Sequence, residues 1–411
     1  MRIPFVTIIA AASVFGVSVI SCFGWGGSHP PEYWIGYTEG MRGGRGTESD
    51  PWVVGDARAF DDRLSRLPAG ALVNLLPGEF ATMGRAGFSL KSGQKLIGAG
   101  IGRTVLRLEA PPEGSPLAVV LATADESAED VVVQDLTVDC NFSSDWGAIT
   151  VQGVNLAGTF HTIRRVEVLG AAGYAQECFA LGIAASSVQS RGNLIENCVV
   201  RAYAGGWCTA IFLVNNSCLA DPFNPDPVFT RGVVRWNLVD LSSGHFPKGG
   251  GCAYGGGGLD GAVFTGNTSQ GAPLGFNFDT TRILNTQLSQ NAFLSCTYTG
   301  INARSNRPGD QIQNLSITNN AINMAPRPGQ PSAFGIAAGG NAEAPAVNLA
   351  ISGNLFTVTN PGATQITGLQ LFGWGGTAAI TDNTFDPAFG QNLQPGPAYQ
   401  LERNSPEIRS K

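Results

Sequence analysis

Short stretches of alternating apolar and polar residues recur along most of this chain, and a polar residue interrupts each stretch at a similar place. An asparagine fills that place in segments such as VRWNLV, FTGNTS and ITNNAI. Successive asparagines lie 24 to 40 residues apart, and Asp135 in VVQDLTV and Arg165 in IRRVEVL fit the same frame. The asparagines of this series are Asn197, Asn237, Asn267, Asn291, Asn320, Asn354 and Asn383.

A period near thirty residues without helical periodicity between the stretches is typical of a solenoid built from short parallel strands. An asparagine at the same bend of every turn can bond neighbouring backbone groups and the next asparagine, which satisfies polar groups that a buried bend would orphan. The sequence therefore predicts an all-β solenoid whose asparagines stack in one inward-facing ladder.

A second set of strands lies between the asparagine segments and includes LGFNFDT at 274–280 and TGINARS at 299–305. Because side chains alternate along a strand, inward phenylalanines in the first segment send Asn277 and Asp279 outward. The same alternation in the second segment sends Asn302 and Arg304 outward. Loops at 215–229, 242–258 and 324–332 break the period, and we expect them to wall a groove over these strands.

The composition agrees with one long domain made of tight turns. The 411 residues include 55 glycines and 24 prolines, and only 14% are charged. Such a composition argues against long helices. We expect a signal peptide at 1–21, a tether and entry segment at 22–50, a solenoid domain at 51–390 and a C-terminal tail at 391–411.

The N-terminus reads as an export signal, with one arginine, a long apolar run and small residues before Cys22. The segment Val19-Ile20-Ser21-Cys22 resembles the lipobox of bacterial lipoproteins, in which the cysteine carries the lipid. We therefore expect an exported lipoprotein, periplasmic or on the cell surface, that touches the membrane only through this anchor. An uncleaved anchor and an ordinary signal peptide stay as alternatives.

Charge and cysteine content exclude several classes of function. Removing residues 1–21 removes one arginine and no acid, so the formal net charge goes from −6 to −7, and nucleic acid is not an expected partner. No CxxC motif occurs, which argues against zinc and redox sites. Cys178 and Cys208 lie 30 residues apart, one period, and are expected to stack on adjacent turns as thiols or as a disulfide.

The segment that opens the solenoid carries a family resemblance. Residues 56–67 (DARAFDDRLSRL) place apolar side chains on one helical face and predict a short helix that caps the solenoid. The sequences LPGEF and LIGAGIGRTVL follow. This opening, together with the asparagine series, resembles the pectate lyase superfamily of right-handed parallel β-helices, over residues 51–390. The resemblance implies that fold and an association with polysaccharide. It leaves the reaction open, because the superfamily includes lyases, hydrolases, epimerases, phage tailspikes and adhesins.

The candidate chemistry centres on Asp279 and Arg304, which the spacing places side by side on adjacent turns. A polysaccharide lyase needs a base for the proton α to a uronic carboxyl group and a cation for the developing enolate. A hydrolase needs two carboxylates, and Asp279 has no evident partner. An ordinary cross-strand salt bridge is the alternative for this pair.

Other residues could complete the groove. His245 and Lys248 lie in the loop GHFPKGGG and are candidates for acid or base catalysis and for contact with an anionic sugar, or are solvated loop residues. Aromatic side chains could stack on sugar rings or pack in the core. The expected substrate-binding residues are Asn277, Asn302, Tyr254, Trp207 and Tyr298.

The sequence therefore predicts a monomeric carbohydrate-active β-helix that acts on an acidic or complex polysaccharide in a groove on one sheet, as a lyase before a hydrolase. A noncatalytic glycan-binding or structural surface scaffold is the alternative. The calcium-binding aspartate cluster of pectate lyases is not evident, so no cofactor or metal site is expected, although Ca²⁺ stays open.

Overall fold

The computed structural model describes residues 41–42, 47–54, 64, 67–82, 86–175, 178–185, 188–201, 203–205, 207–217, 224, 226–244, 246, 250–278, 282–304, 308–339, 347–361, 365–372, 378–389, 391–393 and 399–402. The chain divides between residues 38 and 39 into two units, and every described residue belongs to the second.

Most strands of this second unit form one large sheet of 25 strands. Its members are β1 (Met41–Arg42), β2 (Trp52–Val54), β3 (Leu72–Leu75), β4 (Gly78–Thr82), β6 (Lys95–Ile97), β7 (Thr104–Leu108), β9 (Val132–Asp139), β11 (Thr162–Leu169), β14 (Ser190–Glu196), β15 (Val199–Arg201), β18 (Thr230–Arg235), β19 (Leu238–Asp240), β21 (Leu259–Asp260), β22 (Val263–Thr265), β23 (Thr268–Gln270), β25 (Arg282–Leu284), β26 (Gln287–Ser289), β27 (Ala292–Cys296), β29 (Gln311–Thr318), β30 (Ala321–Met324), β32 (Val347–Ser352), β33 (Leu355–Val358), β35 (Ala378–Thr381), β36 (Thr384–Phe385) and β38 (Tyr399–Glu402).

The other strands form a second sheet of 13. It contains β5 (Ala86–Leu90), β8 (Leu117–Thr123), β10 (Thr150–Leu156), β12 (Ala172–Gly173), β13 (Cys178–Ala185), β16 (Ala204–Gly205), β17 (Trp207–Asn215), β20 (Gly250–Gly257), β24 (Leu274–Phe278), β28 (Thr299–Arg304), β31 (Ser332–Gly339), β34 (Gln365–Phe372) and β37 (Gln391–Leu393). A single turn of 3-10 helix spans Ser144–Trp146.

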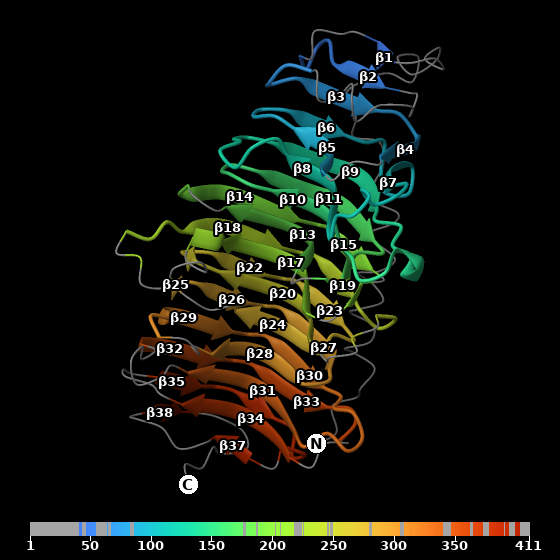
Figure 1. Cartoon of the computed structure of the whole chain (residues 1–411). Helices are drawn as coiled ribbons and strands as arrows, with labels where there is room; N and C mark the ends of the chain where they lie inside the picture. Colours follow the sequence, from blue (N-terminus) through green and yellow to red (C-terminus); the bar gives the residue numbers. More distant parts are fainter. Residues whose placement is uncertain are drawn as a thin grey trace. The chain divides into compact units, whose positions relative to one another are not determined.

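Each turn of the chain adds strands to both sheets and pairs with the next turn in parallel (Figure 1). In one turn, β17 pairs with β20 in the 13-stranded sheet, while β18 and β19 pair with β22 and β23 in the larger sheet. Only β1 with β2 and β10 with β12 pair antiparallel among the described strands. Cys178 and Cys208 are register partners on adjacent turns, as the spacing predicted. The predicted solenoid of parallel strands is confirmed.

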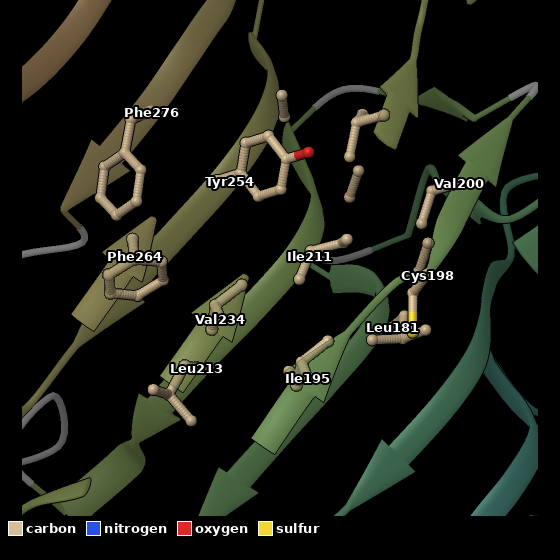
Figure 2. Close-up of a cluster of buried hydrophobic side chains, with 14 of the residues drawn as sticks. Leu181, Ile195, Cys198, Val200, Ile211, Leu213, Val234, Tyr254, Phe264 and Phe276 are labelled. Carbon is tan, nitrogen blue, oxygen red and sulfur yellow. The ribbon is translucent and has the colours of Figure 1, made fainter. Parts of the chain in front are cut away.

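The two sheets enclose a continuous apolar core (Figure 2). Inward side chains from both sheets, such as Leu181, Ile195 and Phe276, are almost fully buried. Some core positions of the 13-stranded sheet must be glycine, since a Cβ on Gly275 would lie 2.7 Å from the Phe293 side chain opposite. The phenylalanines therefore fill space that the glycines leave, which fixes the spacing of the sheets.

The predicted ladder exists and is buried inside the large sheet. Nδ2 of each asparagine donates to Oδ1 of the next at 2.9–3.0 Å. The same Oδ1 accepts a backbone N–H at 2.9–3.2 Å, and each Nδ2 also donates to a carbonyl of the preceding turn. Each member follows a residue with positive φ, so the chain bends sharply there. The ladder consists of Asn237, Asn267, Asn291, Asn320, Asn354 and Asn383.

The prediction was wrong for the first three positions of the series. Asn197, Asp135 and Arg165 have positive φ values of 54°, 60° and 50°, so they occupy the bend position that precedes the ladder. Cys198 fills the ladder place instead, because its N–H donates to Oδ1 of Asn237 at 2.8 Å. Asparagine suits both the bend position and the ladder position, because it tolerates positive φ and its amide also bonds backbone groups. Residue type alone therefore placed these three residues in the ladder, one position away from where they lie.

The predicted capping helix at 56–67 lies outside the described residues except for Leu64 and Leu67, and both of these leucines are buried in the core. Within the described part of the chain, no helix is long and apolar enough to cross a membrane.

Candidate functional site

The outward face of the 13-stranded sheet carries a row of polar side chains from β24 to β34. Register pairs Asn277 with Asn302, Asn302 with Ala337, and Ala337 with Gln370. These positions therefore lie side by side on four successive turns, about 4.8 Å apart.

The two asparagines of this row are joined to each other. Their strand neighbours Phe276, Phe278 and Ile301 are buried in the core, which confirms that the asparagines point outward. Nδ2 of Asn302 donates to Oδ1 of Asn277 at 2.7 Å. Oδ1 of Asn302 is shielded from water and has no hydrogen-bond partner among the described residues. This acceptor is oriented and unused.

Arg304 follows on the same face, two residues after Asn302. Its Nη2 donates to Oε1 of Gln370 at 3.0 Å, two strands away. The guanidinium carbon lies 5.2 Å from the centroid of the Phe334 ring. The intervening strand presents Gly339 opposite Arg304 and Ala337 opposite Gln370, so only small residues separate the arginine from Gln370. The guanidinium therefore contacts both Gln370 on β34 and Phe334 on β31.

The electrostatics of Arg304 follow from its surroundings. Burial lowers the pKa of the guanidinium, and interaction with Tyr298, including a side-chain hydrogen bond, opposes that shift. Since an arginine pKa ordinarily exceeds 12, the group stays charged near neutral pH. The Tyr298 ring meets Phe334 edge-on at 6.3 Å and is 41% exposed. A fixed cation and an exposed aromatic ring therefore share one surface.

The same face is apolar toward the N-terminus. Phe179 and Phe212 on β13 and β17 lie with ring centroids 5.8 Å apart, and Ala184 and Val214 complete a small cluster separate from the main core. Phe212 is only partly buried. A chain-like ligand running along the solenoid axis would meet apolar contacts first and polar contacts further on.

The predicted site residues have different fates. Asn277, Asn302, Arg304 and Tyr298 lie together on this face. Tyr254 does not, because its side chain is buried in the core, with its hydroxyl donating to the carbonyl oxygens of Asn237 and Thr268. The prediction that it contacts substrate was wrong, since its strand alternation places it inward. The remaining candidates, Asp279, His245, Lys248 and Cys22, lie outside the described residues, as does the side chain of Trp207.

Two residues of the site escaped the sequence analysis. Gln370 accepts a hydrogen bond from the Arg304 guanidinium, and the Phe334 ring makes a cation–π contact with it. Alternation in QITGLQLF places Gln370 outward beside Ala337 and could have identified it. Nothing in the sequence indicates that Arg304 bridges two strands. Among the described residues, no group of three or more histidine, cysteine, aspartate or glutamate side chains is placed to hold a metal ion.

Comparison of the sequence with protein families and with curated proteins finds no match. Solved structures do match. A mutant tailspike protein of E. coli bacteriophage HK620, solved with a pentasaccharide, aligns with a TM-score of 0.55 and 11% identity over 84% of this chain and 62% of the tailspike. PfbA, a surface adhesin of Streptococcus pneumoniae, aligns with a TM-score of 0.52 and 13% identity over 86% of this chain and 94% of PfbA.

The A-module of the Azotobacter vinelandii mannuronan C-5 epimerase AlgE4 is 18% identical over 84% of this chain and 94% of the module, with a TM-score of 0.46. The matched structures are right-handed parallel β-helices of the pectin-lyase-like fold, and this chain has that fold.

Proposed function

We propose that this protein binds an acidic polysaccharide along the outward face of the 13-stranded sheet, with Arg304 as the carboxylate-binding residue. The observation that carries the proposal is the fixed cation beside an exposed ring. Arg304 is held by Gln370 and Phe334, and Tyr298 exposes 41% of its surface next to it. A guanidinium that is positioned before binding loses little freedom on contact, so it favours a planar carboxylate over a diffuse charge.

The neighbouring polar row supports a sugar as the ligand. Asn277 and Asn302 are both partly exposed on this row, so their amide groups can meet sugar hydroxyls. The repeat of the strands, about 4.8 Å, offers similar contacts to successive parts of an extended chain. The names of the matched structures agree with a glycan partner, because one is a tailspike in complex with a pentasaccharide and another is an adhesin.

Lyase activity at the same place is the second candidate. β-Elimination moves the proton at C5 of a uronic acid to a base, passes the electron pair of that bond into the C4–C5 bond, and breaks the C4–O bond, whose oxygen leaves with the rest of the chain and takes up a proton from water. Arg304 can neutralise the carboxylate as the enolate develops, and Asp279 is proposed as the base or as the group that orients the sugar. The strands β24, β28, β31 and β34 contain no aspartate or glutamate, and hydrolysis needs two, so we propose a lyase before a hydrolase.

We also propose that the protein is exported, anchored through Cys22, and active as a monomer. Such a protein would meet polysaccharide outside the cytoplasm. Ca²⁺ could assist binding of an acidic chain, so each assay below is run both with added calcium and with a chelator.

The test combines binding and activity. Native gels containing polygalacturonate, alginate or hyaluronate should retard the wild-type protein in at least one case. Arg304→Ala should lose most of that retardation, whereas Arg201→Ala, a matched loss of one exposed arginine from the large sheet, should keep it. The same polymers are then assayed for unsaturated products and for new reducing ends. Unsaturated products indicate a lyase, reducing ends alone indicate a hydrolase, and neither indicates binding without catalysis. Wild-type protein that no acidic polymer retards, or an Arg304→Ala variant retarded like the wild type, would overturn the proposal.

A further inference from the structure

Trp236 stands out on the other side of the solenoid, at the bend that precedes the ladder. It is 55% exposed, the highest value among the large hydrophobic side chains exposed in the described part of the chain. Its φ of 56° is a left-handed value that a bulky residue rarely adopts. Equivalent bends use smaller residues, such as Gly266 and Asn319. A strained and exposed tryptophan calls for an explanation beyond packing.

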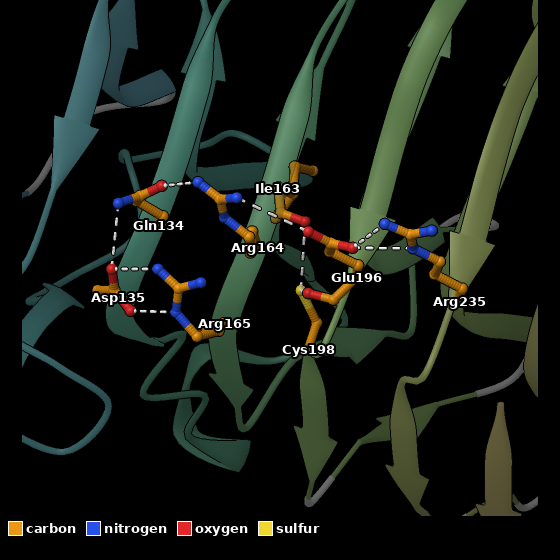
Figure 3. A network of polar contacts seen from close by, with 8 residues as sticks. All are labelled: Gln134, Asp135, Ile163, Arg164, Arg165, Glu196, Cys198 and Arg235. Atoms are coloured by element: carbon orange, nitrogen blue, oxygen red, sulfur yellow. Dashed lines mark hydrogen bonds and ion pairs between the residues drawn. The ribbon is translucent and has the colours of Figure 1, made fainter. Parts of the chain in front are cut away.

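Residues of its own turn and of the neighbouring turns contact the Trp236 ring, among them Arg235, whose ion pair with Glu196 is shown in Figure 3. The guanidinium of Arg235 lies 4.3 Å from the ring centroid. Glu196 fixes that guanidinium from the preceding turn, with contacts of 2.8 Å to Nε and 2.7 Å to Nη2. Gly266 leaves the space that the ring occupies on the next turn, since a Cβ there would lie 2.6 Å from the indole Cδ1. Trp236 is therefore a preformed flat platform.

The register position that Arg235 occupies on its strand changes from charged to uncharged residues on the following turns. The charged residues Arg164, Glu196 and Arg235 precede this point. On the five turns that follow, every residue of this register position carries a hydroxyl group, in a set that we name the hydroxyl column: Thr265, Ser289, Thr318, Ser352 and Thr381. All five are partly exposed. Four strand spacings separate the first from the last, about 19 Å.

The border of this surface is polar, and its charged residues lie at the two ends, where Asn285 bonds Asp260 at 2.8 Å and Asp382 follows Thr381 at the bend. Exposed asparagines at the opposite bend of the same strands bond to each other, Asn348 to Asn314 at 3.0 Å and Asn314 to Asn285 at 2.8 Å. The second outward position on each strand is Val263, Gln287, Ser316, Ala350 or Ala379. None of these side chains is charged or large. The surface thus lacks the apolar centre that a protein partner needs, and it offers many groups that pair with hydroxyls.

We propose that Trp236 and the hydroxyl column form a second carbohydrate-binding surface, separate from the Arg304 site and directed at neutral polysaccharide. The indole would take the apolar C–H face of one sugar ring, and the column would meet the hydroxyls of the chain as it continues along the solenoid axis. A neutral chain is favoured because five successive turns present no charge at this register position, between Arg235 before them and Glu402 after them.

Trp236→Asn is the informative variant, because asparagine occupies the same bend at Asn319 and tolerates its φ. The fold should therefore survive while the platform is lost. Phe160→Asn is the matched control, since Phe160 has a φ of 59°, is 42% exposed and packs against Arg191, but lies at a different bend. Thr318→Val with Thr381→Val removes two hydroxyls of the column at nearly constant shape.

The assay is native electrophoresis through gels that contain hydroxyethyl cellulose, laminarin, galactomannan or soluble starch. We expect wild-type retardation in at least one, about tenfold weaker binding for Trp236→Asn, a smaller loss for the valine double variant, and no change for Phe160→Asn. Trp236→Asn should keep wild-type retardation by acidic polymers, which separates this surface from the Arg304 site. Wild-type protein that no neutral polymer retards, or equal behaviour of Trp236→Asn and Phe160→Asn, would overturn the proposal.

Discussion

Replacing Asn320 with alanine tests how the buried ladder stabilises the solenoid. Asn320 is 1% exposed and lies in the interior of the ladder. Its Oδ1 accepts from the backbone N–H of Asn291 at 3.0 Å and from Nδ2 of Asn291 at 2.9 Å. Its Nδ2 donates to the carbonyl of Leu288 at 3.2 Å and to Oδ1 of Asn354 at 3.0 Å.

The size of the effect follows from what the alanine leaves behind. The N–H of Asn291 loses this acceptor where water does not reach. A buried group left unpaired costs about 1–3 kcal/mol. Nδ2 of Asn291 keeps its bond to the carbonyl of Phe264, and Oδ1 of Asn354 keeps the backbone N–H of residue 320, so their losses are partial. We therefore expect Asn320→Ala to lower the free energy of unfolding by about 2–4 kcal/mol.

Cys198→Ala provides the matched control, because Cys198 fills the same place in an earlier turn. Its thiol makes longer contacts, 3.3 Å and 3.6 Å to two carbonyl oxygens, and burial raises its pKa to about 12, so it stays protonated. The backbone bond to Asn237 survives the change. Equilibrium denaturation in urea should show a loss of about 1 kcal/mol or less at Cys198. Equal losses at the two positions, at unchanged slope, would refute the account of the ladder.

Three further predictions follow from single residues. Burial lowers the pKa of His161, whose neutral ring accepts the N–H of Val131. Its contribution to stability is therefore complete above about pH 6.5 and falls below that value, by at most about 1.4 kcal/mol per pH unit. His161→Gln should weaken the pH dependence of the urea midpoint between about pH 7 and about pH 5, and an unchanged pH dependence would contradict this. Cys22→Ser should release the protein from membranes in fractionation if the lipid anchor is real, and unchanged fractionation would favour an ordinary signal peptide. Gly266→Ala should destabilise the wild type more than it destabilises Trp236→Asn, since only the wild type has the ring in its path; equal losses in a double-mutant cycle would show that the ring does not rest there.

The repeating part of the fold could be predicted because its signals are local. Alternation fixed which residues of 274–278 and 299–304 face outward, and the recurring asparagine revealed the ladder from Asn237 to Asn383. The register of the earliest turns could not be predicted in the same way. There the ladder place holds Cys198, and the asparagine beside it serves the bend.

The site was predictable only in part, for a physical reason. Facing along one strand follows from sequence, so Asn277, Asn302 and Arg304 were identified. A contact between two turns that are not adjacent also requires small side chains on the strand between them. Arg304 reaches Gln370 across the small residues Gly339 and Ala337, and nothing in the sequence indicates that contact. The exposed Trp236 was missed because its position at a bend falls outside the strand alternation.

The claim that Arg304 binds a carboxylate is tested most directly by calorimetric titration of a short oligosaccharide from whichever acidic polymer retards the protein. We expect Arg304→Ala to weaken binding by at least about thirtyfold, the effect of losing a charged hydrogen-bonding group worth about 2 kcal/mol or more. Arg304→Lys should restore only part of the affinity, because a lysine cannot keep the planar contact and the bond to Gln370 together. Wild-type affinity in Arg304→Ala would contradict the account.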